Sequence, residues 1–144
     1  MGFGHAILAF RADDKAKVFN LQIPGCRPDL SPDGKKICWG ASDYVVCAAD
    51  LDLSGPVPKL TNRREVATCV KPNMIYHADW SPDGRYIAFT AGPTKKTLGS
   101  GCAIVGVKAP GWNIGVADAD AKDRKLIITR DGAGNKEPDW VPVK

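Results

Sequence analysis

The chain has 144 residues, of which 44% are hydrophobic and 25% charged, a balance typical of one globular domain that buries a core. Its 15 glycines and 11 prolines predict frequent turns and argue against long helices. The net charge of +4 comes from scattered lysines and arginines, and no apolar run approaches the ~20 residues of a membrane span, so we expect no nucleic-acid partner and no membrane insertion.

Two strands rich in apolar residues are predicted near the N-terminus, at residues 5–10 and 17–23. We interpret residues 1–25 as the outer strands of an incomplete repeat unit. The opening residues lack a basic segment and a small-residue cleavage site, so no signal peptide is visible in this chain.

An internal repeat organises the following residues. Residues 28–40 match residues 78–90 at a constant offset of 50. Residues 44–52 then match residues 112–120 at an offset of 68. The change of offset places an insertion of 18 residues within residues 91–111 of the second copy.

Each copy contains the residue types of four antiparallel strands. The first strand is short and is followed by Ser-Pro-Asp-Gly, at residues 31–34 and 81–84. In this motif Pro fixes φ and Gly tolerates a positive φ, so we expect a tight turn. A β-sandwich with coincidental turns would not explain the preserved spacing. The pattern therefore predicts an all-β fold, a β-propeller of four-stranded antiparallel blades.

The same residues resemble the TolB-like, WD40-like (PD40) β-propeller repeat family. The resemblance rests on residues 28–34 and 78–84, on Pro-Asp-Trp at residues 138–140, and on residues 114–120, which look like the usual third strand and turn. It covers residues 20–142. It implies a propeller of about six blades, protein–protein contacts in the bacterial envelope, and a periplasmic or secreted location.

On this basis the chain is a single partial propeller with about two complete blades and parts of a third. We assign outer strands to residues 1–25, a blade to 26–62, a blade with the insertion 91–111 to 76–130, and the inner strand of a next blade to 136–142. Two interpretations remain open. The chain is a fragment of a longer propeller, which we favour, or its ends combine with those of a second copy in a homo-oligomeric ring.

Cys38 and Cys47 would lie opposite each other if the hairpin turned at residues 42–43, which would allow a cross-strand disulfide. The repeat places Ala88 and Gly115 at the two equivalent positions. Small residues at both sites are typical of tight packing, so we expect Cys38 and Cys47 to be reduced core residues.

The remaining cysteines carry no recognisable chemistry. Cys69 and Cys102 fall in the two irregular segments, where they could pair, and Cys26 would be the odd one. No Cys-x-x-Cys motif occurs, and neither His5 nor His77 has a second ligand at metal spacing. We therefore predict no metal and no cofactor.

Arg27, His77 and Glu137 are aligned by the repeat just before each inner strand, near the mouth of a propeller's central channel. They are our candidate binding residues, although solvated loop residues would show the same pattern. No catalytic constellation is found, so we predict a non-catalytic binding or scaffold module that contacts a protein partner through its loops. The alternative is an accessory or substrate-gating propeller part of a larger secreted hydrolase or other enzyme.

Two long segments, residues 62–76 and 91–111, are further candidates for the partner-facing surface. Asp118, Asp120 and Asp123 resemble a sparse calcium loop, but the Gly and Glu of an EF-hand are missing, so we expect Asx turns. Three aspartates recur with the inner strands and are interpreted as structural: Asp29, Asp79 and Asp139.

Overall fold

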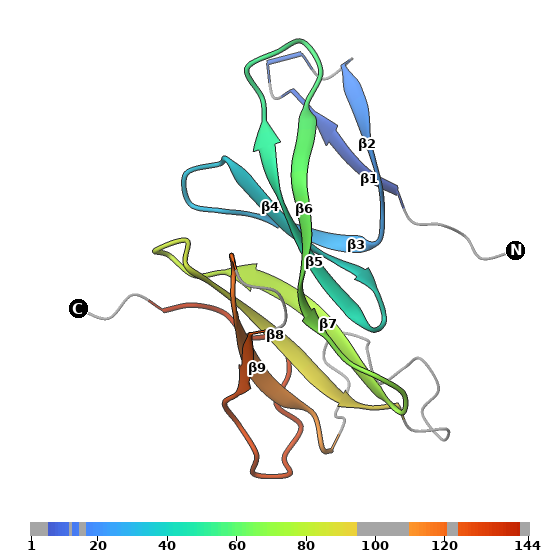
Figure 1. Cartoon of the computed structure of the whole chain (residues 1–144), viewed down its shortest axis with the longest axis vertical. Coiled ribbons are helices and arrows are strands. Elements are labelled where there is room, and N and C mark those ends of the chain that lie inside the picture. The colour runs from blue at the N-terminus through green and yellow to red at the C-terminus, as the bar shows by residue number, and fades with distance from the viewer. Residues whose placement is uncertain (1–5, 12, 15–16, 95–109, 121–123, 142–144) are drawn as a thin grey trace, which may run out of the picture.

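The computed structural model describes residues 6–11, 13–14, 17–94, 110–120 and 124–141, and these residues form ten β-strands and no helix. The strands make three antiparallel sheets, which follow one another along the chain (Figure 1). The predicted all-β class is therefore confirmed for the described part of the chain. No helix formed by these residues is long and apolar enough to cross a membrane.

The N-terminal sheet pairs β1 (Ala6–Phe10) with β2 (Val18–Pro24). The middle sheet runs in the order β3 (Cys26–Leu30), β4 (Lys36–Ser42), β5 (Val45–Asp52) and β6 (Lys59–Thr68). The C-terminal sheet repeats this order with β7 (Asn73–Trp80), β8 (Tyr86–Pro93), β9 (Asn113–Asp118) and β10 (Lys125–Ile127).

The Ser-Pro-Asp-Gly motif forms the predicted turn between the first two strands of both four-stranded sheets. Gly34 has a φ of 69°, and its N–H donates to the Ser31 carbonyl at 2.8 Å. The Ser31 hydroxyl donates to Asp33 at 2.7 Å and accepts from the Lys36 N–H at 2.9 Å. The same bonds recur in the second copy, where φ is again 69° at the glycine and the partners are Ser81, Asp83, Gly84 and Tyr86.

Two of the three hydrophobic clusters formed by the described residues join neighbouring sheets. The first joins Ile7 and Ile23 of the N-terminal sheet to Ile37, Trp39 and Leu51 of the middle sheet. The second joins the opposite face of the middle sheet to the C-terminal sheet, through Cys38, Val46, Ala48, Val66, Ile87, Phe89 and Ala117. The middle sheet is buried on both faces, which explains why its strands are continuous apolar runs without strict alternation.

The fourth strand of the middle sheet is longer than the sequence indicated. We expected this unit to end at residue 62, but β6 continues to Thr68, which pairs with Val45 of β5. Residues 62–68 are therefore strand, and only the short connection from there to Asn73 belongs to a loop.

The last predicted strand, at 136–142, is not formed over residues 136–141, and residue 142 lies outside the described residues. A strand is defined by its hydrogen-bonded neighbour, and no described strand pairs with this segment. Trp140 is nevertheless anchored, because its indole N–H donates to the Asp79 carbonyl at 3.2 Å.

The register that would place Cys38 opposite Cys47, which required a turn at residues 42–43, does not form. The hairpin turns at residues 43–44, and a bulge between Gly40 and Ser42 places Trp39 opposite Cys47 and Cys38 opposite Ala48. Both cysteines are free and fully buried, as expected of small core residues. They point to opposite faces of the sheet and occupy different cores, so they are not placed to form a disulfide.

Candidate functional site

The candidate site lies on the first strands of the two four-stranded sheets. The sequence placed its residues just before these strands, but Arg27 lies within β3 and His77 lies in the middle of β7, while Glu137 is in no strand. Arg27, His77 and Glu137 share a left-handed backbone conformation, with φ of 53°, 55° and 59°. The first two sit at β-bulges, because the strand register shifts between Cys26 and Asp29 and again between Tyr76 and Ala78. A bulge turns its side chain away from the regular alternation of the strand. The repeat thus preserves an unusual backbone geometry at all three positions.

The structure brings Arg27 and His77 into direct contact. A guanidinium nitrogen of Arg27 lies 3.2 Å from His77 Nδ1, and the guanidinium stacks 4.4 Å from the centre of the Tyr76 ring. Arginine can only donate, so Nδ1 is the acceptor in this contact, which leaves the other ring nitrogen, Nε2, as the donor. That nitrogen faces the Asp79 carboxylate at 3.6 Å. The histidine is therefore fixed in orientation from both sides.

His77 and Glu137 line one groove with a volume of about 640 Å³, which is open to solvent. Its other polar walls are carboxylates, and its apolar walls are tryptophans, prolines and one leucine. These residues are Asp29, Asp79, Asp139, Trp80, Trp140, Pro82, Pro138 and Leu30. Four carboxyl groups and one imidazole thus share a surface on which no described lysine or arginine appears. The groove favours positively charged or hydrogen-bond-donating groups.

Asp29 is a groove carboxyl that also accepts a hydrogen bond from the neighbouring sheet. Burial, with the nearby charges of Asp79 and Asp139, raises the pKa of its carboxyl above the usual range. A hydrogen bond from the Trp80 N–H, at 2.8 Å, acts in the opposite direction. This bond joins β3 of one sheet to β7 of the next, so the structural role expected for Asp29 is present.

The described residues contain no group of three His, Cys, Asp or Glu side chains arranged to hold a metal ion. The acidic turn after β9 is held by its own side chains, because Asp118 accepts from the Asp120 N–H at 3.0 Å. The expected Asx turn is therefore confirmed at these two residues. Asp123 lies outside the described residues, as do His5 and Cys102.

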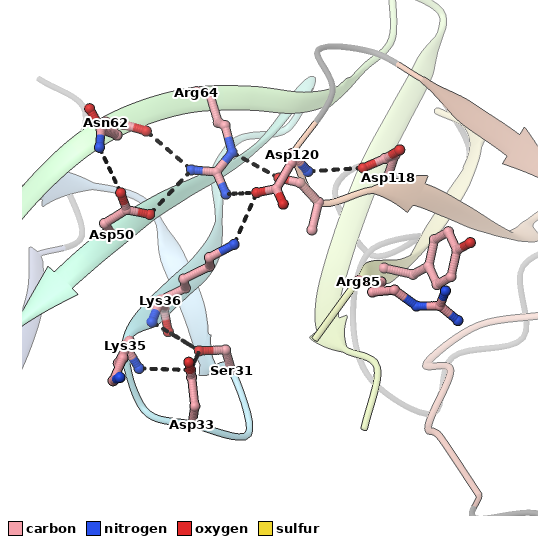
Figure 2. Close-up of polar contacts among 12 residues, drawn as sticks. Ser31, Asp33, Lys35, Lys36, Asp50, Asn62, Arg64, Arg85, Asp118 and Asp120 are labelled. Carbon is pink, nitrogen blue, oxygen red and sulfur yellow. Dashed lines mark hydrogen bonds and ion pairs between the residues drawn. The ribbon is translucent and has the colours of Figure 1, made fainter. Parts of the chain in front are cut away.

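Asp120 instead joins the middle and C-terminal sheets, as Figure 2 shows. Its carboxylate receives Arg64 at 2.9 Å and Lys36 at 3.0 Å, both from the middle sheet. Arg64 also donates to the Ala119 carbonyl at 2.8 Å and pairs with Asp50 at 3.7 Å. This network connects the two sheets whose first strands, β3 and β7, line the groove.

Sequence reasoning found part of this site. It aligned Arg27, His77 and Glu137, but it gave no role to Trp80 and Trp140, which line the groove at equivalent repeat positions. The repeat itself was the available signal for these tryptophans. Arg64 carried no signal, because its counterpart at the offset of 68 is Gly132.

Two segments, residues 62–76 and 91–111, were expected to be loops that face a partner, and the structure bears on them differently. Most of residues 62–76 is strand, and residues 95–109 of the insertion lie outside the described residues. The flanks of the insertion belong to β8, which ends at Pro93, and β9, which begins at Asn113. No family model matches this chain, and no curated protein matches its sequence.

Proposed function

We propose that this chain is part of a TolB-like β-propeller and acts as a non-catalytic module that binds a protein partner. Two observations support the propeller. Both four-stranded sheets have the same strand order and the same Ser-Pro-Asp-Gly turn, and all three sheets stack with a core between neighbours. By the resemblance of the repeats, its location is periplasmic or secreted.

The groove at the inner strands is the binding surface in this proposal. The observation that carries it is the convergence of two repeat-related residues, because His77 and Glu137 line one groove. Arg27 does not line this groove and contacts it only through His77. Carboxylates dominate this groove, so the partner presents a basic segment to it. Trp80 and Trp140 supply apolar surface beside the charges, a combination common at protein interfaces.

A labelled lysine-rich peptide tests this proposal, with fluorescence anisotropy as the measurement. We expect the wild-type chain to bind it, and we expect D79N with E137Q to weaken binding about fivefold or more, because two groove charges are lost. E65Q is the control, since Glu65 is an exposed acid on β6 outside the groove.

Binding should also fall with added salt, because charge interactions at an open groove are screened. An equal loss in E65Q and in the groove variant would assign the affinity to net charge and reject the groove. Failure of the wild-type chain to bind the peptide would reject a basic partner segment.

A further inference from the structure

The imidazole of His77 lies between groups of opposite charge. Its side chain lines the acidic groove and is 23% exposed, and no other histidine occurs among the described residues. The Arg27 guanidinium lies 3.2 Å from Nδ1, and the Asp79 carboxylate lies 3.6 Å from Nε2. Histidine is the side chain whose charge changes most readily between about pH 5 and pH 8. A proton added to this ring therefore acts in opposite directions on its two neighbours.

The Arg27 guanidinium is held in place by a contact that does not involve the imidazole. It stacks 4.4 Å from the centre of the Tyr76 ring, and that ring meets the His77 ring edge-on with the centroids 6.0 Å apart. Burial raises the pKa of the Tyr76 hydroxyl above its usual value of 10, so this group stays neutral in the same pH range. Tyr76 thus keeps a positive charge beside Nδ1 whichever charge the imidazole carries.

Protonation of His77 reverses the contact with Arg27. The neutral ring accepts a hydrogen bond from the guanidinium at Nδ1, whereas the imidazolium carries a proton on both nitrogens. Two donors, and two positive charges, would then face each other across the 3.2 Å contact.

The other charged groups around His77 are carboxylates, and they attract the imidazolium. They come from its own strand, from β3 and from the C-terminal segment, and are Asp79, Asp29, Glu137 and Asp139. The protonated ring therefore loses its partner outside the groove and gains attraction to the acids inside it.

We propose that His77 is a pH-sensitive switch that controls the negative charge of the acidic groove. In the neutral state Arg27 holds the ring, and the carboxylates remain available to a basic segment. In the protonated state the imidazolium separates from Arg27 and pairs with the carboxylates, so the groove releases a basic segment on acidification. The release rests on the proposed function, since it concerns the same groove and the same partner chemistry. The exchange of partners at His77 does not rest on it.

Fluorescence anisotropy with the lysine-rich peptide at constant ionic strength tests the release. We expect the wild-type chain to bind about threefold or more weakly at pH 5.5 than at pH 7.5, because the groove gains a positive charge. H77N should lose most of this difference, since asparagine cannot be protonated, can accept from Arg27 through its side-chain carbonyl, and tolerates the left-handed backbone at this position. H5N is the matched control, because it removes the other histidine of the chain and should keep the wild-type difference.

Asp29 contributes separately to the pH dependence of the groove. Burial raises the pKa of its carboxyl, so its protonation also weakens binding as the pH falls. H77N retains Asp29, and the difference between the wild-type and H77N profiles therefore isolates the histidine. Equal losses of affinity in the wild type and H77N would overturn the proposal, as would a loss in H5N equal to that in H77N.

R27M tests the part played by the guanidinium. Methionine keeps an unbranched apolar side chain beside Tyr76 but removes the charge and the donor that oppose a proton on Nδ1. We expect the fall in affinity to begin at a higher pH in R27M than in the wild type. An unchanged midpoint would show that Arg27 does not control the switch.

Nitrogen NMR of the imidazole, without any peptide, follows the exchange of partners directly. At pH 8 we expect the His77 proton on Nε2 in the wild type and a mixture of tautomers in R27M, with both nitrogens protonated in each protein at pH 5. A wild-type ring that carries its proton on Nδ1 at pH 8, or a tautomer that R27M leaves unchanged, would overturn the switch. A peptide that binds at no pH would reject the proposed function instead, so the two failures are distinguishable.

Discussion

Gly115 lies beneath the Phe89 ring in the C-terminal sheet. It pairs with Phe89, and a Cβ at this position would collide with the Phe89 ring and lie 3.1 Å from Ile127 Cδ1. We expect G115A to destabilise the fold by about 1–3 kcal/mol, as overpacking of a filled core does. Urea denaturation measures this loss. G40A is the control, because its Cβ would meet only the Cys26 carbonyl at 3.7 Å, and an equal loss there would reject the steric explanation.

Asp83 makes the folding stability of the protein depend on pH in the acidic range. The Ser81 hydroxyl, the Arg85 N–H and the Arg85 side chain lower the pKa of its carboxyl to about 2. A carboxyl whose pKa is depressed on folding contributes stability that is present above its unfolded pKa of about 3.8. This contribution is lost as the pH falls toward 2.

We therefore expect the urea midpoint of the wild type to fall between about pH 4.5 and pH 2, and D83N to show a shallower fall. Identical pH profiles of the two proteins would show that Asp83 does not contribute to this acid sensitivity.

The residue types at equivalent repeat positions predicted which side chains are buried better than they predicted the pairing register of the strands. The repeat correctly indicated that Cys38 and Cys47 are small core residues, because Ala88 and Gly115 stand at the same positions. It could not place them on opposite faces, since that depends on a single bulged residue, Ala41. One extra residue in a strand reverses the face of every side chain beyond it, and no composition signal announces it.

At the scale of elements, the bond from the Trp80 N–H to Asp29 joins two sheets at a place where negative charge is unfavourable. A carboxyl with a raised pKa contributes stability that is present below its unfolded pKa and lost as the pH rises through the folded one. D29N keeps an acceptor oxygen and removes the charge. We expect it to be as stable as the wild type or more stable at pH 7, and this advantage should vanish near pH 3.

D29A removes the acceptor as well, and should cost about 1–2 kcal/mol at both pH values, because it leaves the Trp80 N–H without this partner. Denaturation of both variants at pH 3 and pH 7 measures these differences. A stability loss in D29N at pH 7 equal to that in D29A would contradict the charge argument.

The strands and turns of the two four-stranded sheets were largely predictable from the sequence. The exception is β6, whose second half was not predicted as a strand. Its second half begins Asn-Arg-Arg-Glu, which has no apolar alternation, so the sequence indicated a loop. These residues form the outer strand of a sheet, where Arg64 extends to the next sheet and Glu65 is exposed. Pairing with β5 holds them extended, and tertiary pairing of this kind overrides local preference.

The whole molecule is a stack in which each site depends on neighbouring sheets. The repeat placed Arg27 and His77 at equivalent positions of two units, and their 3.2 Å contact arises because those units pack together. The acidic groove likewise combines residues from β3 and β7, the first strands of two sheets, with the segment that contains Glu137. A sequence pattern gives the equivalence of positions, whereas their distance depends on how the sheets stack.

The two buried cysteines report separately on the two cores of this stack. Cys38 is enclosed between two four-stranded sheets, whereas Cys47 is covered by the two-stranded N-terminal sheet. A two-stranded sheet is only marginally stable, so it should open before the rest of the molecule. Burial raises the pKa of both thiols, which keeps them unreactive while they are covered.

We expect an alkylating reagent to modify the exposed Cys26 without denaturant, Cys47 at low urea, and Cys38 only near global unfolding, with mass spectrometry of peptides as the measurement. C47A is the control, because removing that thiol should leave the urea dependence at Cys38 unchanged within about 0.5 kcal/mol if the two cores are independent. Simultaneous modification of Cys38 and Cys47 at every urea concentration would mean that all three sheets unfold as one cooperative unit. In that case the N-terminal sheet would be stabilised by its packing in the whole stack and would not open separately.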